Sequence, residues 1–202
     1  MKKRPPVSLA TGAGPWMIER NALVIRQIPN GLQILLPMGS APIPVRHFVA
    51  DEASVRVTPA DCRFHFWQRK VDGRPRALVT VVSTPDAVAK FYDQLSAERG
   101  VLQSAAEFLS SRSLDERPLC EPPDEPEHCV TVKSNVILAT LSNQEFELDF
   151  YDVPASATRR VAQAEAGLQV DPVVRIDLST LLVPALGEAL RQARQNLPTE
   201  PS

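Results

Sequence analysis

Basic side chains and a tryptophan gather in one stretch of this 202-residue chain. Within residues 62–82, two alternating runs flank an Asp-Gly pair at 72–73, which is typical of a β-hairpin. Because successive side chains of a strand point to opposite faces, Cys62, Phe64 and Phe66 are expected in the core. The other face and the turn then carry Arg63, His65, Trp67, Arg69, Lys70, Arg74 and Arg76. Cations beside a stacking ring bind single-stranded nucleic acid in other proteins, so this hairpin is a candidate surface for it.

An acidic strand is expected at 145–151, where Glu145, Glu147 and Asp149 alternate on one face. Such a row can serve acid–base chemistry or bind a divalent cation, but it is more often a solvated strand face. An offset of 84 residues aligns this strand with the basic one and matches Arg63 with Glu147, His65 with Asp149, and Trp67 with Tyr151. Complementary charges favour docking. Either the two halves of the chain pack across these faces, or the faces pair between chains and form an oligomer.

The spacing of cysteine and histidine argues against a metal site. Cys62 and His65 would lie on opposite faces of one strand, and adjacent His128 and Cys129, close to Cys120, would also point apart if extended. We therefore expect free thiols and no bound metal.

Residues for catalysis are equally sparse. His47 and His65 are the plausible bases, but neither lies in a recognisable nucleophile motif. The pair Gly12 and Gly14 is followed by Pro15 rather than by a helix after a strand, so a phosphate-binding loop is not expected. The sequence predicts no enzyme activity and no cofactor.

Composition narrows the class of protein. Basic and acidic residues number 22 and 24, so no overall field attracts the chain to nucleic acid or to an anionic membrane. The 44% of hydrophobic residues suffice for a core, and no apolar stretch approaches a membrane span or resembles a signal peptide. With three cysteines, which cannot all pair, we expect a reduced, cytoplasmic protein. Nineteen prolines favour short elements and many turns.

The first half of the chain predicts an antiparallel module followed by a helix. Its expected elements are a flexible tail at 1–20, a hairpin of strands 22–28 and 32–38, strands at 45–49 and 54–58, the basic hairpin, a helix from Thr84 to Gly100, and a short helix at 102–109. Thr84 can cap the long helix, Pro85 suits its first position, and Asp86 suits its positive end. Residues 21–111 form the first module, and the acidic, proline-rich segment 112–128 is expected to be a linker.

The second module is expected at 129–196, before a tail at 197–202. Its predicted elements are strands at 129–132, 136–141, 145–151 and 173–178, a small-residue stretch at 154–167, and a helix at 181–195. Both modules thus follow a strand–strand–strand–helix order. The offset is 84 for the first aligned strand, 97 for the next, which places Val79 on Ile176, and 95 for the helix. We interpret this as internal duplication in an α+β fold of antiparallel sheets with helices packed on one face.

Residues 142–150 (Ser-Asn-Gln-Glu-Phe-Glu-Leu-Asp-Phe) precede Val174-Arg175-Ile176-Asp177-Leu178-Ser179-Thr180 and an apolar helix. This pattern resembles a small bacterial family of unknown function, with an S-x-x-E-F-x-L-D-F strand and an arginine-isoleucine strand before a capped helix. The resemblance covers residues 133–196. It implies a layout similar to that of the SecB type of protein-export chaperone, an analogy of fold that does not by itself license a function.

Two functions of different class follow. The first is a non-enzymatic protein-binding module, a chaperone-like holder, adaptor or assembly subunit, with outer apolar positions such as Leu78 and Val82 free for a client or a second copy. The alternative is a nucleic-acid accessory protein that binds single strands through residues 63–76. As a third explanation, the charges of this basic hairpin only prevent strand-to-strand aggregation, which is common for such hairpins.

Overall fold

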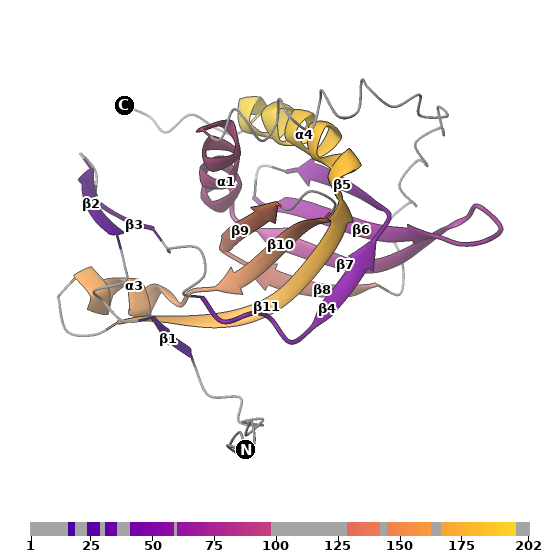
Figure 1. Cartoon of the computed structure of the whole chain (residues 1–202). Coiled ribbons are helices and arrows are strands. Elements are labelled where there is room, and N and C mark those ends of the chain that lie inside the picture. The colour runs from indigo at the N-terminus through magenta and orange to yellow at the C-terminus, as the bar shows by residue number, and fades with distance from the viewer. Residues whose placement is uncertain are drawn as a thin grey trace, which may run out of the picture.

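Two main β-sheets and three α-helices make up the part of the chain described by the computed structural model (Figure 1). The described residues are 41–58, 60–97, 129–141, 145–162 and 167–196, together with the strand backbones of 16–18, 24–28 and 31–35. The α+β class predicted from the sequence is confirmed. The predicted short helix at 102–109, the linker and the C-terminal tail lie outside the described residues.

The first sheet contains the predicted basic hairpin. Its strands are β5 (Glu52–Val57), β6 (Cys62–Arg69), β7 (Pro75–Ser83) and β8 (Val130–Ser134), in that order. The first three pair antiparallel, and β8 runs parallel to β7. Gly73 has a φ of 80°, the left-handed conformation that an Asp-Gly turn requires. The hairpin prediction is confirmed.

The second sheet is built around the longest strand. Its strands are β9 (Val136–Leu141), β10 (Glu145–Asp152) and β11 (Leu168–Ser179), with β4 (His47–Ala50) and β1 (Trp16–Ile18) also on β11. β4 runs parallel to β11, and β1 runs antiparallel to it. β1 corrects the prediction of a tail through residue 20, because its three residues pair with residues 168–170 at the start of β11. The predicted first hairpin is confirmed as β2 (Val24–Ile28) and β3 (Gly31–Leu35).

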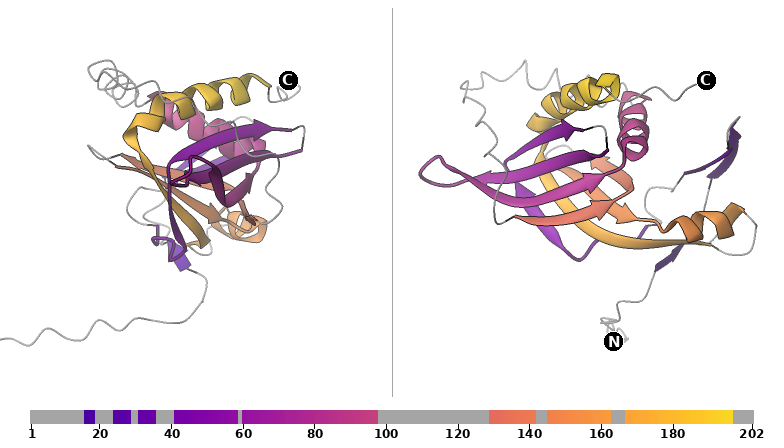
Figure 2. Two further views of the ribbon diagram at one scale, coloured as in Figure 1. Left: turned by 90° about the vertical axis from the view of Figure 1, so that its right-hand side faces the viewer. Right: turned by 180° about the vertical axis from the view of Figure 1, so that it is seen from behind.

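Two bent strands join the sheets along both edges (Figure 2). β4 continues into β5 through Asp51, and β8 continues into β9 through Asn135. The backbone N–H of Asp51 donates to the Trp67 carbonyl, and that of Asn135 donates to the Tyr151 carbonyl, both over 3.0 Å. The strands therefore form a closed wall around a single interior.

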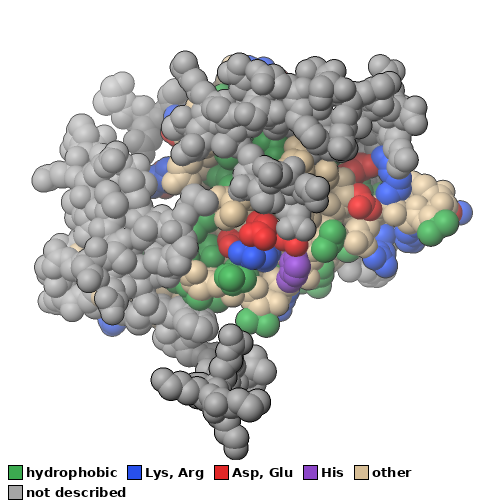
Figure 3. Space-filling view, in the orientation of Figure 1, with side chains coloured by type: hydrophobic (Ala, Val, Ile, Leu, Met, Phe, Trp, Pro, Cys, Tyr) green, Lys and Arg blue, Asp and Glu red, His purple; other side chains and the backbone are tan. Residues whose placement is uncertain are grey.

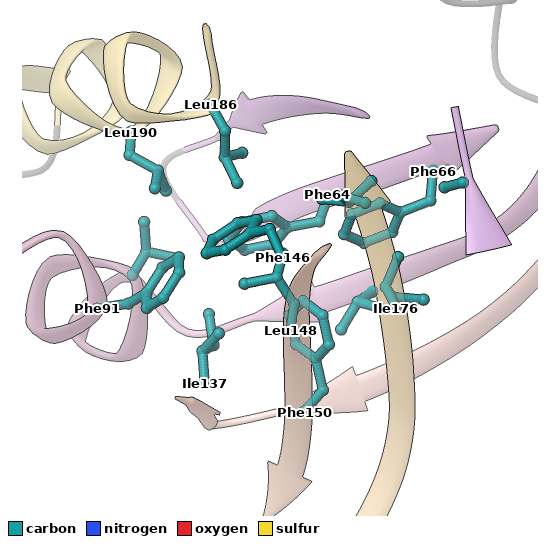
Figure 4. Close-up of a cluster of buried hydrophobic side chains, with 14 of the residues drawn as sticks. Phe64, Phe66, Phe91, Ile137, Phe146, Leu148, Phe150, Ile176, Leu186 and Leu190 are labelled. Carbon is teal, nitrogen blue, oxygen red and sulfur yellow. The ribbon is translucent and has the colours of Figure 1, made fainter. Parts of the chain in front are cut away.

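Aromatic side chains from both halves of the chain fill this interior (Figure 4). Phe64 and Phe66 on β6 contact Phe150 on β10 edge to face, with ring centroids 5.6 and 5.9 Å apart. Leu148 and Ile176 are fully buried in the same cluster. The inward positions predicted from alternation are confirmed, and the two halves share one core.

Two helices lie together over one end of the sheets (Figure 1). They are α1 (Pro85–Ala97) and α4 (Val183–Asn196), the latter preceded by the 3₁₀ turn η2 (Thr180–Leu182). Thr84 Oγ1 accepts the Ala87 N–H over 3.2 Å, which confirms the predicted cap. Each helix buries its predicted apolar stripe, which includes Phe91 on α1 and Leu186 and Leu190 on α4.

The small-residue stretch at 154–167 contains a helix that the sequence pattern did not predict. This helix, α3 (Ala155–Ala162), buries Ala157 and Val161 in a second, smaller cluster against β11. β11 also begins earlier than the predicted residue 173. Pro172 interrupts the pattern there, but it pairs with Tyr151 beside a bulge, where a proline is tolerated within a strand.

The pairing registers of the two halves coincide. Adding 84 to Phe64 and 95 to Val81 turns their pairing into that of Leu148 with Ile176. Val81 also pairs in parallel with Val132, and Ile176 pairs in parallel with Phe48. Adding 95 to Val81 and subtracting 84 from Val132 turns the first pair into the second. The offset for the second strand is therefore 95, as for the helix, and the predicted 97 is wrong by two residues. Duplication as the origin of this correspondence stays a prediction.

Candidate binding surfaces

Trp67, predicted to stack on a ligand, is buried. A bulge between Phe66 and Trp67 interrupts the alternation of β6, and the Trp67 side chain is only 3% exposed. Its Nε1–H donates to Glu52 Oε2 over 3.0 Å. The prediction that Trp67 lies on the outer cationic face is therefore wrong, because alternation cannot anticipate an extra residue in one strand.

Most of the predicted basic residues of the hairpin have polar partners in the hairpin or close to it in the first sheet. Four pairs can be named: Arg63 with Asp61, Arg69 with Glu52, Arg74 with Asp72, and Arg76 with Gln68. Lys70 is exposed at the end of the hairpin. The Thr58 hydroxyl donates to Asp61 over 2.8 Å and, with Arg63, lowers the pKa of that carboxyl. The hairpin is thus a set of local pairs rather than one open cationic patch.

A basic row that includes Arg63 crosses the outer side of the first sheet. Arg56 on β5 is the cross-strand partner of Arg63, which pairs with Val82, which in turn pairs with Lys133 on β8. Direct partners share a face and lie about 4.8 Å apart, so these residues form one row. We call Arg56, Arg63, Val82 and Lys133 the basic row.

His65 lies beside this row on the same outer side. Its Nδ1 is 3.1 Å from Thr80 Oγ1, and Thr80 Oγ1 is 3.9 Å from Cys129 Sγ. Burial raises the pKa of the Cys129 thiol, which opposes formation of a reactive thiolate. Cys62, by contrast, is fully buried on the inner side. Among the described residues, no group of three or more His, Cys, Asp or Glu side chains is arranged to hold a metal ion.

The outer side of the second sheet carries an acidic cluster around one arginine. Arg175 on β11 donates two hydrogen bonds of 2.7 Å to Asp149 on β10 and lies 3.3 Å from Glu147. His47 Nε2 on β4 lies 2.6 Å from Asp177 Oδ2, while Asp177 Oδ1 is buried without a hydrogen-bond partner among the described residues. We call Glu147, Asp149, Arg175, Asp177 and His47 the acidic face. Figure 3 shows acidic, basic and histidine side chains together on this side of the molecule.

The acidic strand is more buried than a solvated row. Asp149 is only 8% exposed, and its hydrogen bonds raise the pKa of the Arg175 guanidinium above its usual value. Tyr151 is buried beside a bulge equivalent to the one at Trp67. Burial, followed by the charge of Asp149, raises the pKa of the Tyr151 hydroxyl. As placed, Tyr151 and Trp67 are not available to a partner, and Asp149 is largely covered. The side chain of Glu145 lies outside the description.

The two charged surfaces do not meet within one chain. The sheets pack through Phe64, Phe66 and Phe150, so their outer sides point away from each other. The predicted alternative in which the halves dock through their charged faces is therefore wrong. Each face finds its nearest counter-ions on its own sheet.

Apolar side chains on β4 and the segment before it border the acidic face. Ile43 is 64% exposed, Val45 95% and Val49 55%. Val49 is the cross-strand partner of Asp177, and His47 is the partner of Arg175. The sequence predicts the strand at 45–49 but not this border, because the alternation of Val45, His47 and Val49 does not indicate which face of the strand stays uncovered. Leu78 and Val82, predicted as outer apolar positions, are half-buried. Leu78 packs against the interior cluster, so the prediction that it is free for a client is wrong.

A pocket of about 490 Å³ lies between α1, β9 and α3. Its apolar lining includes Phe91, Ile137 and Leu168, and Asp86 and Lys90 at its polar side pair with each other over 2.6 Å. Such a pocket suits an apolar group. The sequence could not indicate it, because one wall is the unpredicted α3.

Comparison of the chain with protein-family models, curated proteins and solved structures found no match. The resemblance to a small bacterial family and to SecB stays a prediction. None of the helices in the described ranges has the length and apolar character needed to cross a membrane.

Proposed function

We propose that this chain is a non-enzymatic, cytoplasmic protein-binding module that acts as a chaperone-like holder, adaptor or assembly subunit. Its binding surface is the acidic face together with the apolar border of Ile43, Val45 and Val49. The observation that carries the proposal is this border, since three strongly exposed apolar side chains fall within seven residues.

The chemistry of the surface suits a protein partner. Exposed apolar side chains gain free energy when a partner removes them from water, by about 25 cal/mol per Å². The neighbouring charges then select among partners and fix their orientation. Contiguous apolar surface rimmed by polar groups is characteristic of interaction sites.

The backbone of β4 supports the same proposal. β11 pairs with one side of β4, and no described strand pairs with the other, where the Gln68 side chain donates to the Val49 carbonyl over 2.8 Å. An extended client segment could lie along this side and cover Val45 and Val49.

A client-aggregation assay tests the proposal. At an equimolar ratio, the wild-type protein should delay the aggregation of a chemically unfolded client enzyme. The double variant Val45→Asp, Val49→Asp should lose at least half of the delay, because charge at the border opposes apolar contact. Val71→Asp is the matched control, since Val71 is an exposed valine that lies at the hairpin turn.

Retention of the full delay by the double variant would reject the border as the binding surface. No delay by the wild-type protein would reject the holder role. Before either conclusion is drawn, thermal unfolding should show that the wild-type protein and the double variant are folded.

The basic row favours nucleic acid as the second candidate function. Arg56 and Lys133 are exposed, as phosphate contacts require, although no exposed aromatic side chain lies beside them within the described residues. Oligonucleotide retention should fall steeply with salt and disappear in the variant Arg56→Glu, Lys133→Glu. Unchanged retention in this variant would remove the second candidate.

A further inference from the structure

We infer that the protein associates with further copies of itself head to tail, the acidic face of one copy resting on the basic row of the next. The inference builds on the proposed function, because it names a partner for the same acidic face. That partner is a second copy of this chain.

The two surfaces match in spacing. By the shifts that relate the two halves, Arg56, Arg63, Val82 and Lys133 correspond to Thr140, Glu147, Asp177 and Val49. Each set is a row of cross-strand partners on the outer side of a twisted four-strand arrangement. Each row places two like charges on neighbouring strands, Arg56 with Arg63 in one and Glu147 with Asp177 in the other. A pair of cations on one sheet and a pair of carboxylates on the other are therefore separated by one strand interval, and each row also includes one half-buried or exposed valine.

Each surface also keeps an excess of charge. Glu147, Asp149 and Asp177 share one arginine, with His47 as the only other cationic candidate in the described part of this face. On the basic row, Arg56 and Lys133 have no ion pair with any described residue, and Asp61 is the partner of Arg63. Docking the two surfaces would bring each excess next to its counter-charge.

The arrangement of the surfaces determines the kind of assembly. They lie on the outer sides of opposite walls, so one copy cannot satisfy both from within. A symmetric contact of like faces would place carboxylate against carboxylate, which is repulsive. A contact of unlike faces is heterologous, and each added copy leaves one acidic and one basic surface open. The structure therefore favours linear growth with concentration over a closed dimer.

Two charge-reversal variants test the inference. The basic-row variant is Arg56→Glu, Lys133→Glu. The acidic-face variant is Glu147→Lys together with Thr140→Lys, because exposed Thr140 on β9 is the cross-strand partner of Glu147. The control is Arg159→Glu, Arg160→Glu on α3, where both arginines are exposed and belong to neither surface. Sedimentation velocity over a range of concentrations, after nuclease treatment, measures the average mass of each protein.

At about 20 mM salt, the average mass of the wild-type protein and of the control should rise with concentration. At about 500 mM salt, where screening shortens the reach of charges, it should return toward a single chain. Either charge-reversal variant alone should associate at least tenfold more weakly. An equimolar mixture of the two variants should associate again, because each supplies an intact surface that fits the other.

Any of the following results would overturn the inference: a single-chain mass for the wild-type protein at every concentration, association unaffected by either reversal, or no recovery in the mixture of two variants that unfold like the wild-type protein. Loss of association on nuclease treatment would show bridging by nucleic acid and would also overturn it. The client-aggregation assay tests the proposed function independently of self-association. A delay that persists in a strictly single-chain protein would retain that function and reject self-association.

Discussion

Arg175 is the residue on which the acidic face depends. Its guanidinium binds Asp149 through two hydrogen bonds and also faces Glu147, while only 16% of its side chain is exposed. Replacing it removes the partner of a carboxylate that is itself largely buried. An unpaired buried charge is strongly unfavourable.

We predict that Arg175→Met lowers the free energy of unfolding by about 2–4 kcal/mol, the lower part of this range reflecting partial exposure. Urea denaturation measures the change. Arg191→Met is the control, since Arg191 and Glu188 form an exposed pair on α4 and its loss should leave the midpoint unchanged. Equal effects of the two substitutions would contradict the role given to Arg175.

Two buried acids make stability sensitive to high pH. Burial raises the pKa of the Cys62 thiol from 9.0 to about 11, and burial also raises the pKa of the Tyr151 hydroxyl. The unfolded chain releases these protons at lower pH than the folded protein does. The contribution of Cys62 to stability is therefore complete below about pH 9 and decreases as the pH rises from there through about 11. The contribution of Tyr151 decreases at higher pH, because its ordinary pKa of 10.0 is higher.

We predict a lower urea midpoint at about pH 10.5 than at about pH 8. In Cys62→Ala this difference should shrink, although the variant is less stable at both values because it leaves a small cavity. An identical pH response in Cys62→Ala and the wild-type protein would contradict the assignment to this thiol.

At the residue scale, alternation predicted the inward side chains correctly until a bulge intervened. Phe64, Phe66, Leu148 and Phe150 point inward as expected. The residue after each bulge does not follow the alternation, and no residue type announces this. The partners of Arg69 and Arg175 were likewise unpredictable, because ion pairs across strands depend on register.

The two bent strands are the elements that close the fold. At one bend, Asn135 Nδ2 donates to the Val153 carbonyl over 2.7 Å, and its Oδ1 accepts the Val153 N–H over 2.8 Å. At the equivalent bend, the Asp51 carboxylate accepts the Arg69 N–H over 2.8 Å. Each side chain thus satisfies backbone groups where the ladder changes partner.

We predict that Asn135→Ala lowers the free energy of unfolding by about 2 kcal/mol, since two backbone groups lose their hydrogen bonds. Asn135→Asp keeps the acceptor and should lose less, while Asp51→Asn should be close to neutral. Urea denaturation of the three variants checks this order. A neutral Asn135→Ala would mean that the bend does not need its side chain.

At the element scale, elements marked by local sequence signals were predicted better than elements that depend on a packing partner. The cap at Thr84 and the Asp-Gly turn are local, so the sequence located α1 and the β6–β7 hairpin well. Pro172 led to a short β11, because its tolerance beside a bulge depends on the partner strand. α3 was missed because its stability comes from packing Ala157 and Val161 on β11, which no local pattern shows.

The whole molecule depends on one interior shared by both halves. Phe150 from the second half contacts Phe64 and Phe66 from the first, and parallel pairs join β7 to β8 and β11 to β4. Loss of either half would therefore expose the core of the other. Such mutual dependence gives cooperative unfolding.

We predict that Phe150→Ala lowers the free energy of unfolding by about 3–5 kcal/mol and lowers the protection of β6 and β10 amides together. Hydrogen exchange followed by mass spectrometry measures both strands in one experiment. Retained protection of β6 with loss confined to β10 would show two independent folding units.

At the scale of the molecule, the sequence indicated two similar halves but not how they combine. Hairpins are specified by their turns, whereas the parallel pairs join strands that no short turn connects. Charge matching between Arg63 and Glu147 suggested contact between the halves through those faces. The interior aromatic residues determine the contact instead, and the charged faces are left outside.

The shared edge strands have a practical consequence for a cut chain. If the connection between α1 and β8 is opened, one fragment retains β4 to α1 and the other retains β8 to α4, and neither holds a complete sheet. The first piece supplies β4 to the sheet of the second, and the second supplies β8 to the sheet of the first. Two such polypeptides, made separately, should reconstitute the native assembly as a complementing pair, and a reporter divided between them would signal whenever they meet.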